Sequence, residues 1–457
     1  MISRRPTGAR AELSGPVSTG RFIEPISAVP VDLAAHGYLS EEFFVSGTAS
    51  AYGAVGPLGT DGRWSVTAQE SADYRTRILV RRPSDPERFN GTVLVEWFNV
   101  SSGREANPDW TYLSPQIIGD GYAYVGVSAQ RTGVDGGDAL VGVPGMAPRR
   151  GLVASGPDRY GALRHPGDGF SFDILSQIGR ALRAPGPGSA LGALRLERLV
   201  AVGESQSAFF LTTYINAVQP IAQVYDGFFV HSRGGSAASL TGTPMASDDV
   251  PRGLQIRSDT DVPVVIFETE TDLGPLLDYG PARQPDSDRI RIWEVAGTAH
   301  ADAYVIGGFA SVLGCDFTVN EGPQHFVVQA ALVALNRWIT EGVAPATAPP
   351  LRLAKTTPPE LARDALGNAL GGVRTPAVDV PISALSGESP PGASRLCALF
   401  GSTVPFDAST LVRLYENEAR YLEAYERSLD TAIAAGFLLE SDRTELLAQA
   451  EAVSFSS

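Results

Sequence analysis

Residues 199–208 read Leu-Val-Ala-Val-Gly-Glu-Ser-Gln-Ser-Ala, an apolar strand that runs directly into a turn and then into an apolar helix. Gly203, Ser205 and Ser207 form a Gly-x-Ser-x-Ser motif centred on that turn. A serine on so sharp a turn brings the residues two before and two after it against neighbouring backbone, so both must be small. The motif predicts that Ser205 is a nucleophile. The alternative is an ordinary turn in which the serine only caps the helix.

The segments on both sides of this motif alternate between strand-like and helical patterns. Several strand-like runs are almost continuous in Val, Ile, Leu and Phe, as in strands buried on both faces of a parallel sheet. The sequence therefore predicts an α/β fold, with a mostly parallel central sheet and helices on both faces. The predicted strands are 42–49, 74–80, 92–100, 122–128, 199–202, 227–230, 262–267 and 290–295, and the predicted helices are 109–118, 170–182, 206–218 and 324–339.

The length of 457 residues exceeds what one such sheet needs. We predict a catalytic domain over residues 1–342, with Gly- and Pro-rich insertions at 130–169 and 232–261 that shape the substrate pocket. Residues 343–457 are predicted to form an extension packed on that domain, irregular at first and helical beyond residue 407. Its last helix is expected to begin at Asp442, with Glu445 completing a capping box.

Composition excludes several classes of protein. Hydrophobic residues make up 43% of the chain, which argues against disorder. The net charge of −15 and the lack of a basic cluster argue against a nucleic-acid partner. No apolar run reaches the length of a membrane span, and the basic N-terminus lacks the apolar segment of a signal peptide, so we expect a cytoplasmic protein. Cys315 and Cys397 are compatible with one disulfide or with two buried thiols.

A serine hydroxyl becomes an effective nucleophile when a base removes its proton and a carboxylate orients that base. In folds with this strand–turn–helix motif, nucleophile, acid and histidine follow one another along the chain. His300 lies in a loop of small residues directly after the predicted strand 290–295, so we predict that it is the base. His325 opens the next helix and fits a packing role. His231 comes too early to follow the acid but is a candidate for the pocket wall.

The acid is expected just after the strand that precedes the histidine. That strand, 262–267, is followed by three carboxylates, Glu268, Glu270 and Asp272. The acid usually lies a few residues into the loop, which favours Asp272 and leaves Glu270 as the second candidate. Glu268 is expected to end the strand.

The negatively charged intermediate of acyl transfer needs backbone amides as hydrogen-bond donors. One predicted donor is the amide of Gln206, which follows the nucleophile at a helix N-terminus. The loop after the third predicted strand is expected to supply the other. We assign it to the amide of Val100, with Ser101 as the alternative.

Other chemistries have little support in the sequence. There is no phosphate-binding Gly-x-x-x-x-Gly-Lys-Ser/Thr loop, and no glycine cluster follows a strand with dinucleotide-binding spacing. The five histidines and two cysteines form no zinc-ligand pattern. We therefore predict no metal ion and no cofactor.

Six motifs extend along nearly the whole chain, at residues 43–49, 95–100 with 108–110, 203–208, 283–288, 296–302 and 367–372. With these motifs the chain resembles the large bacterial "alpha/beta hydrolase domain" proteins, a family of serine esterases. In such proteins the serine of Gly-Glu-Ser-Gln-Ser is expected to be the nucleophile, which corresponds to Ser205. The resemblance implies an α/β-hydrolase fold and says little about the substrate.

Together these features predict a serine esterase that cleaves a small-molecule carboxylic ester through an acyl-enzyme, using Ser205, His300 and Asp272. One alternative is a lactonase, amidase or acyltransferase with the same three residues. Another is a binding protein without catalysis on a hydrolase scaffold.

Overall fold

The computed structural model describes residues 8–27, 30–141, 149–184, 186, 188–245, 247–308 and 313–455. The chain divides into two compact units, which are taken separately below. Unit 1 comprises residues 1–264 and 281–290, and unit 2 comprises residues 265–280 and 291–457. The predicted domain boundary at residue 342 stays a prediction. Of the predicted insertions, residues 142–148 and 246 lie outside the described residues.

Unit 1 is built on a mixed sheet in which the strand order is β1-β2-β3-β5-β4-β8-β9. The pairs β5–β4, β4–β8 and β8–β9 are parallel, and β1, β2 and β3 add antiparallel pairs. Apart from Arg198 at the start of β8, the parallel strands are buried, as their continuous apolar sequences predict. The strands are β1 (Glu12–Ser14), β2 (Tyr38–Ala54), β3 (Val66–Pro83), β4 (Thr92–Trp97), β5 (Ala123–Val127), β8 (Arg198–Glu204) and β9 (Gly227–His231).

Helices pack against this sheet, and α1, α5 and α6 contact its strands directly. The predicted helix 206–218 starts where expected, but its second half, Tyr214–Val218, is a π-helical turn. The helices of unit 1 are α1 (Pro108–Gly119), α2 (Arg131–Asp135), α3 (Leu152–Ser155), α4 (Pro157–Tyr160), α5 (Ser171–Leu182), α6 (Gln206–Thr213) and α7 (Gln219–Ala222), and the short strands β6 (Gly136–Gly137) and β7 (Arg149–Arg150) pair with each other.

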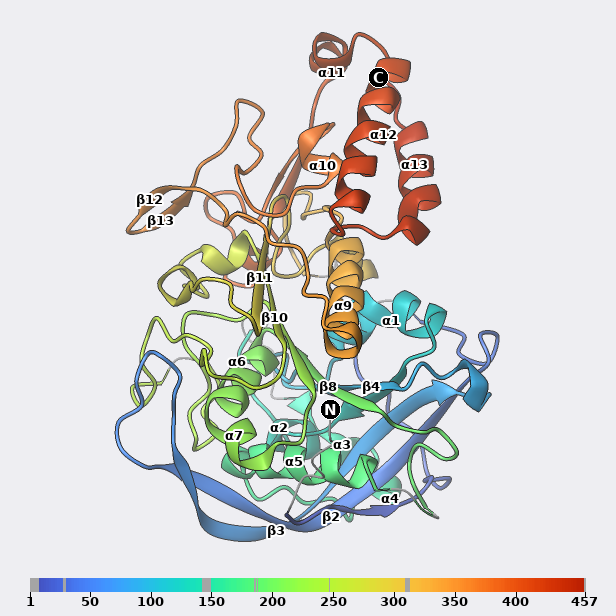
Figure 1. The fold of residues 1–457 in the computed structure, drawn as a ribbon, viewed down its shortest axis with the longest axis vertical. Helices are drawn as coiled ribbons and strands as arrows, with labels where there is room; N and C mark the ends of the chain where they lie inside the picture. The colour runs from blue at the N-terminus through green and yellow to red at the C-terminus, as the bar shows by residue number, and fades with distance from the viewer. Residues whose placement is uncertain are drawn as a thin grey trace. The chain divides into compact units, whose positions relative to one another are not determined.

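The strands β2 and β3 are about twice as long as predicted and form the curved ribbon drawn in blue in Figure 1. Their paired register runs from Tyr38↔Pro83 to Ala54↔Val66. The outer half of the ribbon carries small and polar residues, most of them at least partly exposed. An apolar pattern marks only the half that is buried, which is why the sequence predicted the shorter strands.

Unit 1 contains a buried ion-pair network centred on Arg77 and Glu42. The guanidinium of Arg77 on β3 contacts Glu42 at 2.7 Å and Glu105 at 2.6 Å. Arg159 of α4 binds the second oxygen of Glu42 at 2.5 Å, and the Tyr160 hydroxyl donates to Glu42 at 3.0 Å. The network therefore ties the ribbon to the loop after β4 and to the 130–169 insertion.

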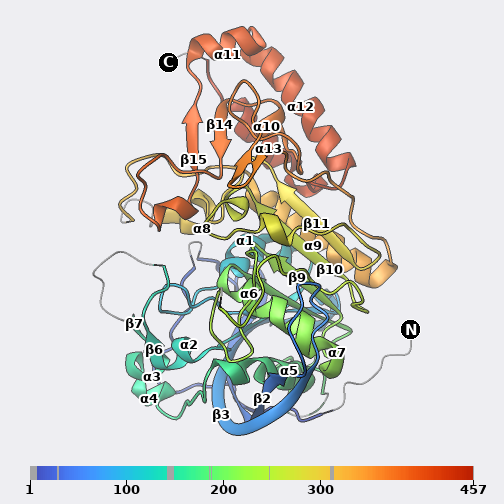
Figure 2. The same cartoon turned by 90° about the vertical axis from the view of Figure 1, so that its left-hand side faces the viewer.

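Unit 2 contains two neighbouring strands, β10 and β11, followed by small two-stranded sheets and helices. Figure 2 shows β14 and β15 side by side, with α11 and α12 following them along the chain. The elements are β10 (Val264–Thr269), β11 (Ile290–Val295), α8 (Ala303–Ile306), α9 (Gln324–Glu341), β12 (Leu353–Thr356), β13 (Pro359–Leu361), α10 (Pro376–Asp379), β14 (Ser383–Ser386), β15 (Ser402–Pro405), α11 (Ala408–Tyr415), α12 (Glu418–Ala434) and α13 (Arg443–Glu451).

The helical end of the chain follows the predicted pattern except at the last helix. Asp442 directly precedes α13, as expected, but the predicted capping box with Glu445 is wrong. The Asp442 carboxylate instead accepts a hydrogen bond from the amide of Leu439, at 3.3 Å, and caps the preceding short 3-10 turn. Local spacing alone does not tell which of two successive turns a carboxylate will cap.

The two cysteines form a disulfide, the first of the two alternatives that the sequence left open. Cys315 and Cys397 are joined with their Cα atoms 5.7 Å apart. The turn that begins at Cys397 contacts the chain next to His300, because the amide of Ala301 donates to the carbonyl of Leu399 at 3.1 Å. The crosslink therefore holds a segment that touches the loop of the predicted base.

Candidate active site

Ser205 occupies the turn between β8 and α6 in a strained backbone conformation, with φ 57° and ψ −122°. Such a conformation is uncommon for a residue with a side chain and costs about 1–3 kcal/mol, so it persists where the surrounding structure imposes it. The amide of Ser205 donates to the carbonyl of His231 on β9 at 2.9 Å. The parallel pairing of β8 with β9 therefore fixes the turn.

The two small residues of the motif face each other across the turn. A Cβ placed on Gly203 would lie 3.0 Å from Leu211 and 3.1 Å from the Cβ of Ser207. Ser207 is itself fully buried. This crowding is the steric reason that the motif needs small side chains at both positions.

A chain of side-chain hydrogen bonds fixes the orientation of Gln206. Trp97 Nε1 and Gln206 Nε2 both donate to Oε1 of Gln130, at 3.0 and 2.9 Å. Gln206 Oε1 then accepts from the amide of Val100 at 3.3 Å. Because the indole N–H and the backbone amide at the two ends are obligatory donors, both glutamine amides can point only one way.

Both backbone amides considered as the second oxyanion donor already make a hydrogen bond. The amide of Val100 donates to the Gln206 side chain, and the amide of Ser101 donates to Asn99 Oδ1 at 2.8 Å. The bond to Val100 is at the long end of the normal range, and it is therefore the weaker of the two. The choice between the two donors stays open, with Val100 still the first choice.

Asn99 also connects the same loop to β8, the strand that precedes Ser205. Its Nδ2 donates to the carbonyl of Glu204 at 3.2 Å and to Oε2 of the same residue at 3.3 Å. The loop after β4 is thus held to the turn through both Asn99 and Gln206. These contacts of Gln130 and Asn99 were not predicted, because their partners Gln206 and Glu204 lie 76 and 105 residues away in the sequence.

In unit 2, His300 and Asp272 form a buried pair. His300 Nδ1 lies 2.7 Å from Asp272 Oδ1. The other oxygen of Asp272 accepts from the amide and the hydroxyl of Thr269, at 2.6 and 2.8 Å. A carboxylate at Nδ1 fixes the imidazole tautomer and leaves Nε2 as the proton acceptor.

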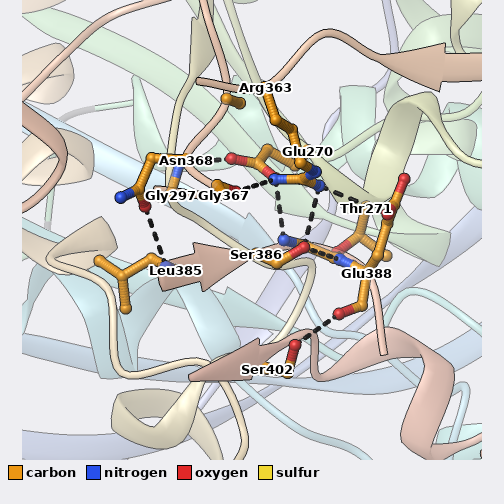
Figure 3. Close-up of polar contacts among 12 residues, drawn as sticks. Glu270, Thr271, Gly297, Arg363, Gly367, Asn368, Leu385, Ser386, Glu388 and Ser402 are labelled. Atoms are coloured by element: carbon orange, nitrogen blue, oxygen red, sulfur yellow. Dashed lines mark hydrogen bonds and ion pairs between the residues drawn. The ribbon is translucent and has the colours of Figure 1, made fainter. Parts of the chain in front are cut away.

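The second candidate for the acid, Glu270, has other partners. Its Oε1 accepts from the amide of Gly297 at 2.6 Å, and its Oε2 contacts Arg363 at 3.0 Å (Figure 3). Burial raises the pKa of Glu270 against the opposing effect of Arg363 and the backbone amides. Glu270 therefore contacts the backbone of the histidine loop, whereas Asp272 contacts the imidazole. Glu268 lies within β10, one residue before its end.

Two other histidines, His231 and His325, lie in packed surroundings. His231 is fully buried, with Nδ1 2.9 Å from Oδ1 of Asp109. Burial raises the pKa of Asp109 to about 8. His325 stacks flat on Tyr304, with ring centroids 4.0 Å apart. The Asp109–His231 pair was not predicted, because 122 residues separate its members.

The predicted residues fall into two groups by unit. Ser205, Gln206 and Val100 belong to unit 1, where the last two are in contact. His300 and Asp272 belong to unit 2 and are also in contact. Among the described residues, no group of three or more His, Cys, Asp or Glu side chains is arranged to hold a metal ion. Nor does any helix in that part of the chain have the length and apolar character of a membrane span.

Comparison with known proteins gives one extensive match. A family model described as "Alpha/beta hydrolase domain" matches residues 13–448. Among solved structures, a fungal esterase from Rhizomucor miehei is 12% identical, with a TM-score of 0.31, covering 65% of this chain and 85% of that chain. A glucuronoyl esterase from Solibacter usitatus is 10% identical, with a TM-score of 0.31, covering 63% of this chain and 82% of that chain. No curated protein matches the chain.

Proposed function

Because the chain belongs to the alpha/beta hydrolase domain family, we propose that it is a serine esterase that cleaves a small-molecule carboxylic ester through an acyl-enzyme intermediate. The chain has the α/β-hydrolase fold of that family. The observation that carries the proposal is the strained backbone of Ser205 on the turn between β8 and α6. An ordinary helix-capping serine has no need of this conformation, whereas a nucleophile on a sharp turn does.

In the proposed reaction, Ser205 Oγ attacks the ester carbonyl while His300 Nε2 takes the hydroxyl proton. Asp272 holds the imidazole at Nδ1 and stabilises the positive charge that forms there. His300 then gives the proton to the departing alcohol. A water molecule attacks the acyl-enzyme, and the same histidine serves as its base.

The charge of the tetrahedral intermediate falls on the former carbonyl oxygen. The backbone amide of Gln206, at the N-terminus of α6, is the first proposed donor to this oxygen. The amide of Val100 is the second. For Val100 to contribute, its long hydrogen bond to the Gln206 side chain must lengthen further or be shared with the oxyanion.

Covalent labelling tests the proposal. A fluorophosphonate should label the folded wild-type protein at one site, and mass spectrometry of the peptides should find the label on Ser205. Ser205→Ala should not be labelled. Ser409→Ala, which removes an exposed serine of α11, should be labelled at the wild-type rate. A wild-type protein that resists the probe, or a label on another residue, would contradict the proposal.

A second experiment on the same protein identifies the acceptor of the acyl group, which is either water or an alcohol. An ester panel that varies the acyl and alcohol chains, run with and without an added primary alcohol, measures both the substrate preference and the fate of the acyl group. Under the proposed function most of the acyl group appears as the free acid. Predominant transfer to the alcohol would instead indicate an acyltransferase.

A further inference from the structure

The buried carboxylate of Glu270 joins three segments of unit 2 that are far apart in the sequence (Figure 3). Its Oε1 accepts from the amide of Gly297, at 2.6 Å, in the loop that leads from β11 to His300. Its Oε2 accepts from the amide of Gly387 and from Arg363 Nη2, both at 3.0 Å. One side chain therefore connects the acid loop, the histidine loop and the chain beyond residue 343.

The neighbouring residue makes a parallel set of contacts. Thr271 Oγ1 accepts from the amide of His300 at 3.1 Å and donates to the carbonyl of Gly387 at 2.7 Å. The backbone of the histidine loop is thus held at Gly297 and at His300 itself. Glu270 and Thr271 each also bond to the backbone of Gly387, so both side chains link the histidine loop to Gly387.

The approach of Gly387 is so close that only glycine fits. A Cβ at this position would lie 2.4 Å from the Cβ of Glu270, 2.5 Å from the amide nitrogen of Thr271 and 2.8 Å from the carbonyl oxygen of Thr298. Real Cβ atoms essentially never make non-bonded contacts shorter than 3.0 Å. The segment around residue 387 is therefore packed directly onto the acid loop and the histidine loop.

Arg363 links Glu270 to two further residues of unit 2. Besides Glu270, its guanidinium donates to Ser386 Oγ at 2.9 Å and to the carbonyl of Gly367 at 3.1 Å. The side chain is 21% exposed, so its ion pair with Glu270 is largely shielded from water. Arg363 thus fixes residues 367 and 386 relative to the carboxylate that holds the histidine loop.

We propose that Glu270 and Arg363 are positioning residues for His300, so that Arg363, which lies beyond residue 343, contributes to the active site. This inference rests on the proposed function, in which His300 is the base. A displacement of a catalytic group by about 1 Å can cost about a hundredfold in rate. Loss of the carboxylate frees the histidine loop at Gly297, and loss of the guanidinium removes a donor that orients this carboxylate. Asp272 and its bond to the imidazole remain in both cases.

The test compares variants in hydrolysis of an activated ester. Glu270→Gln keeps the side-chain shape but turns an amide N–H toward donors, and Arg363→Met removes the guanidinium and keeps the aliphatic chain. Each should lower kcat by about tenfold to a hundredfold with KM within about twofold of wild type. The acid limb of the pH–rate profile should also shift, because that limb reports on His300. Arg363→Lys, which restores the charge without the fork, should recover part of the loss.

Arg374→Met is the matched control. Arg374 lies in the same segment, is 25% exposed, and forms its ion pair with Asp379, without a contact to the acid or histidine loop. Its kcat and its pH–rate profile should match wild type. Near-UV circular dichroism and thermal unfolding verify that each variant is assayed as folded protein. If Arg363→Met does not fold, the kcat and the pH–rate profile of Arg363→Lys are used in its place.

Three results are distinguishable. Reduced kcat and a shifted acid limb in the folded Glu270 and Arg363 variants, but not in Arg374→Met, support the inference. Wild-type kcat and pH profile in those folded variants overturn it. So does a loss of activity that only follows the folded fraction and occurs equally in Arg374→Met. Ser205→Ala is assayed alongside, because activity in that variant would show that the proposed function itself has failed.

Discussion

The Nδ1 atom of His300 lies 2.7 Å from Oδ1 of Asp272, and both side chains are buried. The second oxygen of Asp272 is held by Thr269 at the end of β10. The carboxylate therefore has one oxygen for the imidazole and one for the strand that carries it. In the proposed mechanism this arrangement sets the tautomer of His300 before any substrate binds.

The first prediction concerns this carboxylate. Asp272→Asn retains the shape of the side chain but allows the wrong imidazole tautomer, so kcat on an activated ester should fall about a thousandfold to ten-thousandfold. Steady-state kinetics on folded protein measures it. Asp379→Asn, at an exposed ion pair of the same unit, serves as the control and should remain within about twofold. An Asp272→Asn enzyme within tenfold of wild type would rule out this role.

A second prediction concerns stability. Arg77→Met leaves Glu42 and Glu105 buried without their shared cation, which should lower the free energy of unfolding by about 3–5 kcal/mol. Arg82→Met, on the same strand, breaks the more exposed pair with Glu41 and should cost no more than about 1 kcal/mol. Urea unfolding of the two variants gives the comparison. Equal losses of unfolding free energy in the two variants would mean that the buried network stabilises the protein no more than the more exposed pair does.

A third prediction concerns the pH dependence of stability. Burial lowers the pKa of His325 from 6.5 to about 4, so between these pH values the folded protein binds fewer protons than the unfolded chain. The free energy of unfolding should therefore fall as the pH drops from about 6.5 to about 4, by about 1–3 kcal/mol from this residue. His325→Phe should remove that part of the loss. His36→Phe, at an exposed ring, is measured alongside as the matched substitution. A His325→Phe protein with the full wild-type loss would refute the assignment.

Local features of the active site were predictable from the sequence. The turn at Ser205 is visible because a strand, a small-residue motif and a helix adjoin each other in ten residues. The preference for Asp272 over Glu270 followed from its offset past the strand, and the structure gives the two carboxylates different partners. The fold class was predictable for the same reason, since buried parallel strands carry continuous apolar runs.

Side-chain partners distant in the sequence were not predictable. Gln206 contacts Gln130 across 76 residues, and Arg363 contacts Glu270 across 93. Gln130 and Arg363 lie in segments whose own sequences fit an ordinary loop or helix end. Their pairing depends on tertiary packing, which no local periodicity records.

The nucleophilic role of Ser205 is tested most directly by the hydrolysis of an activated ester by Ser205→Ala. We expect a loss of at least about a thousandfold in kcat, with circular dichroism and thermal unfolding unchanged from wild type. Turnover at the wild-type rate by the folded Ser205→Ala protein would show that Ser205 is not the nucleophile.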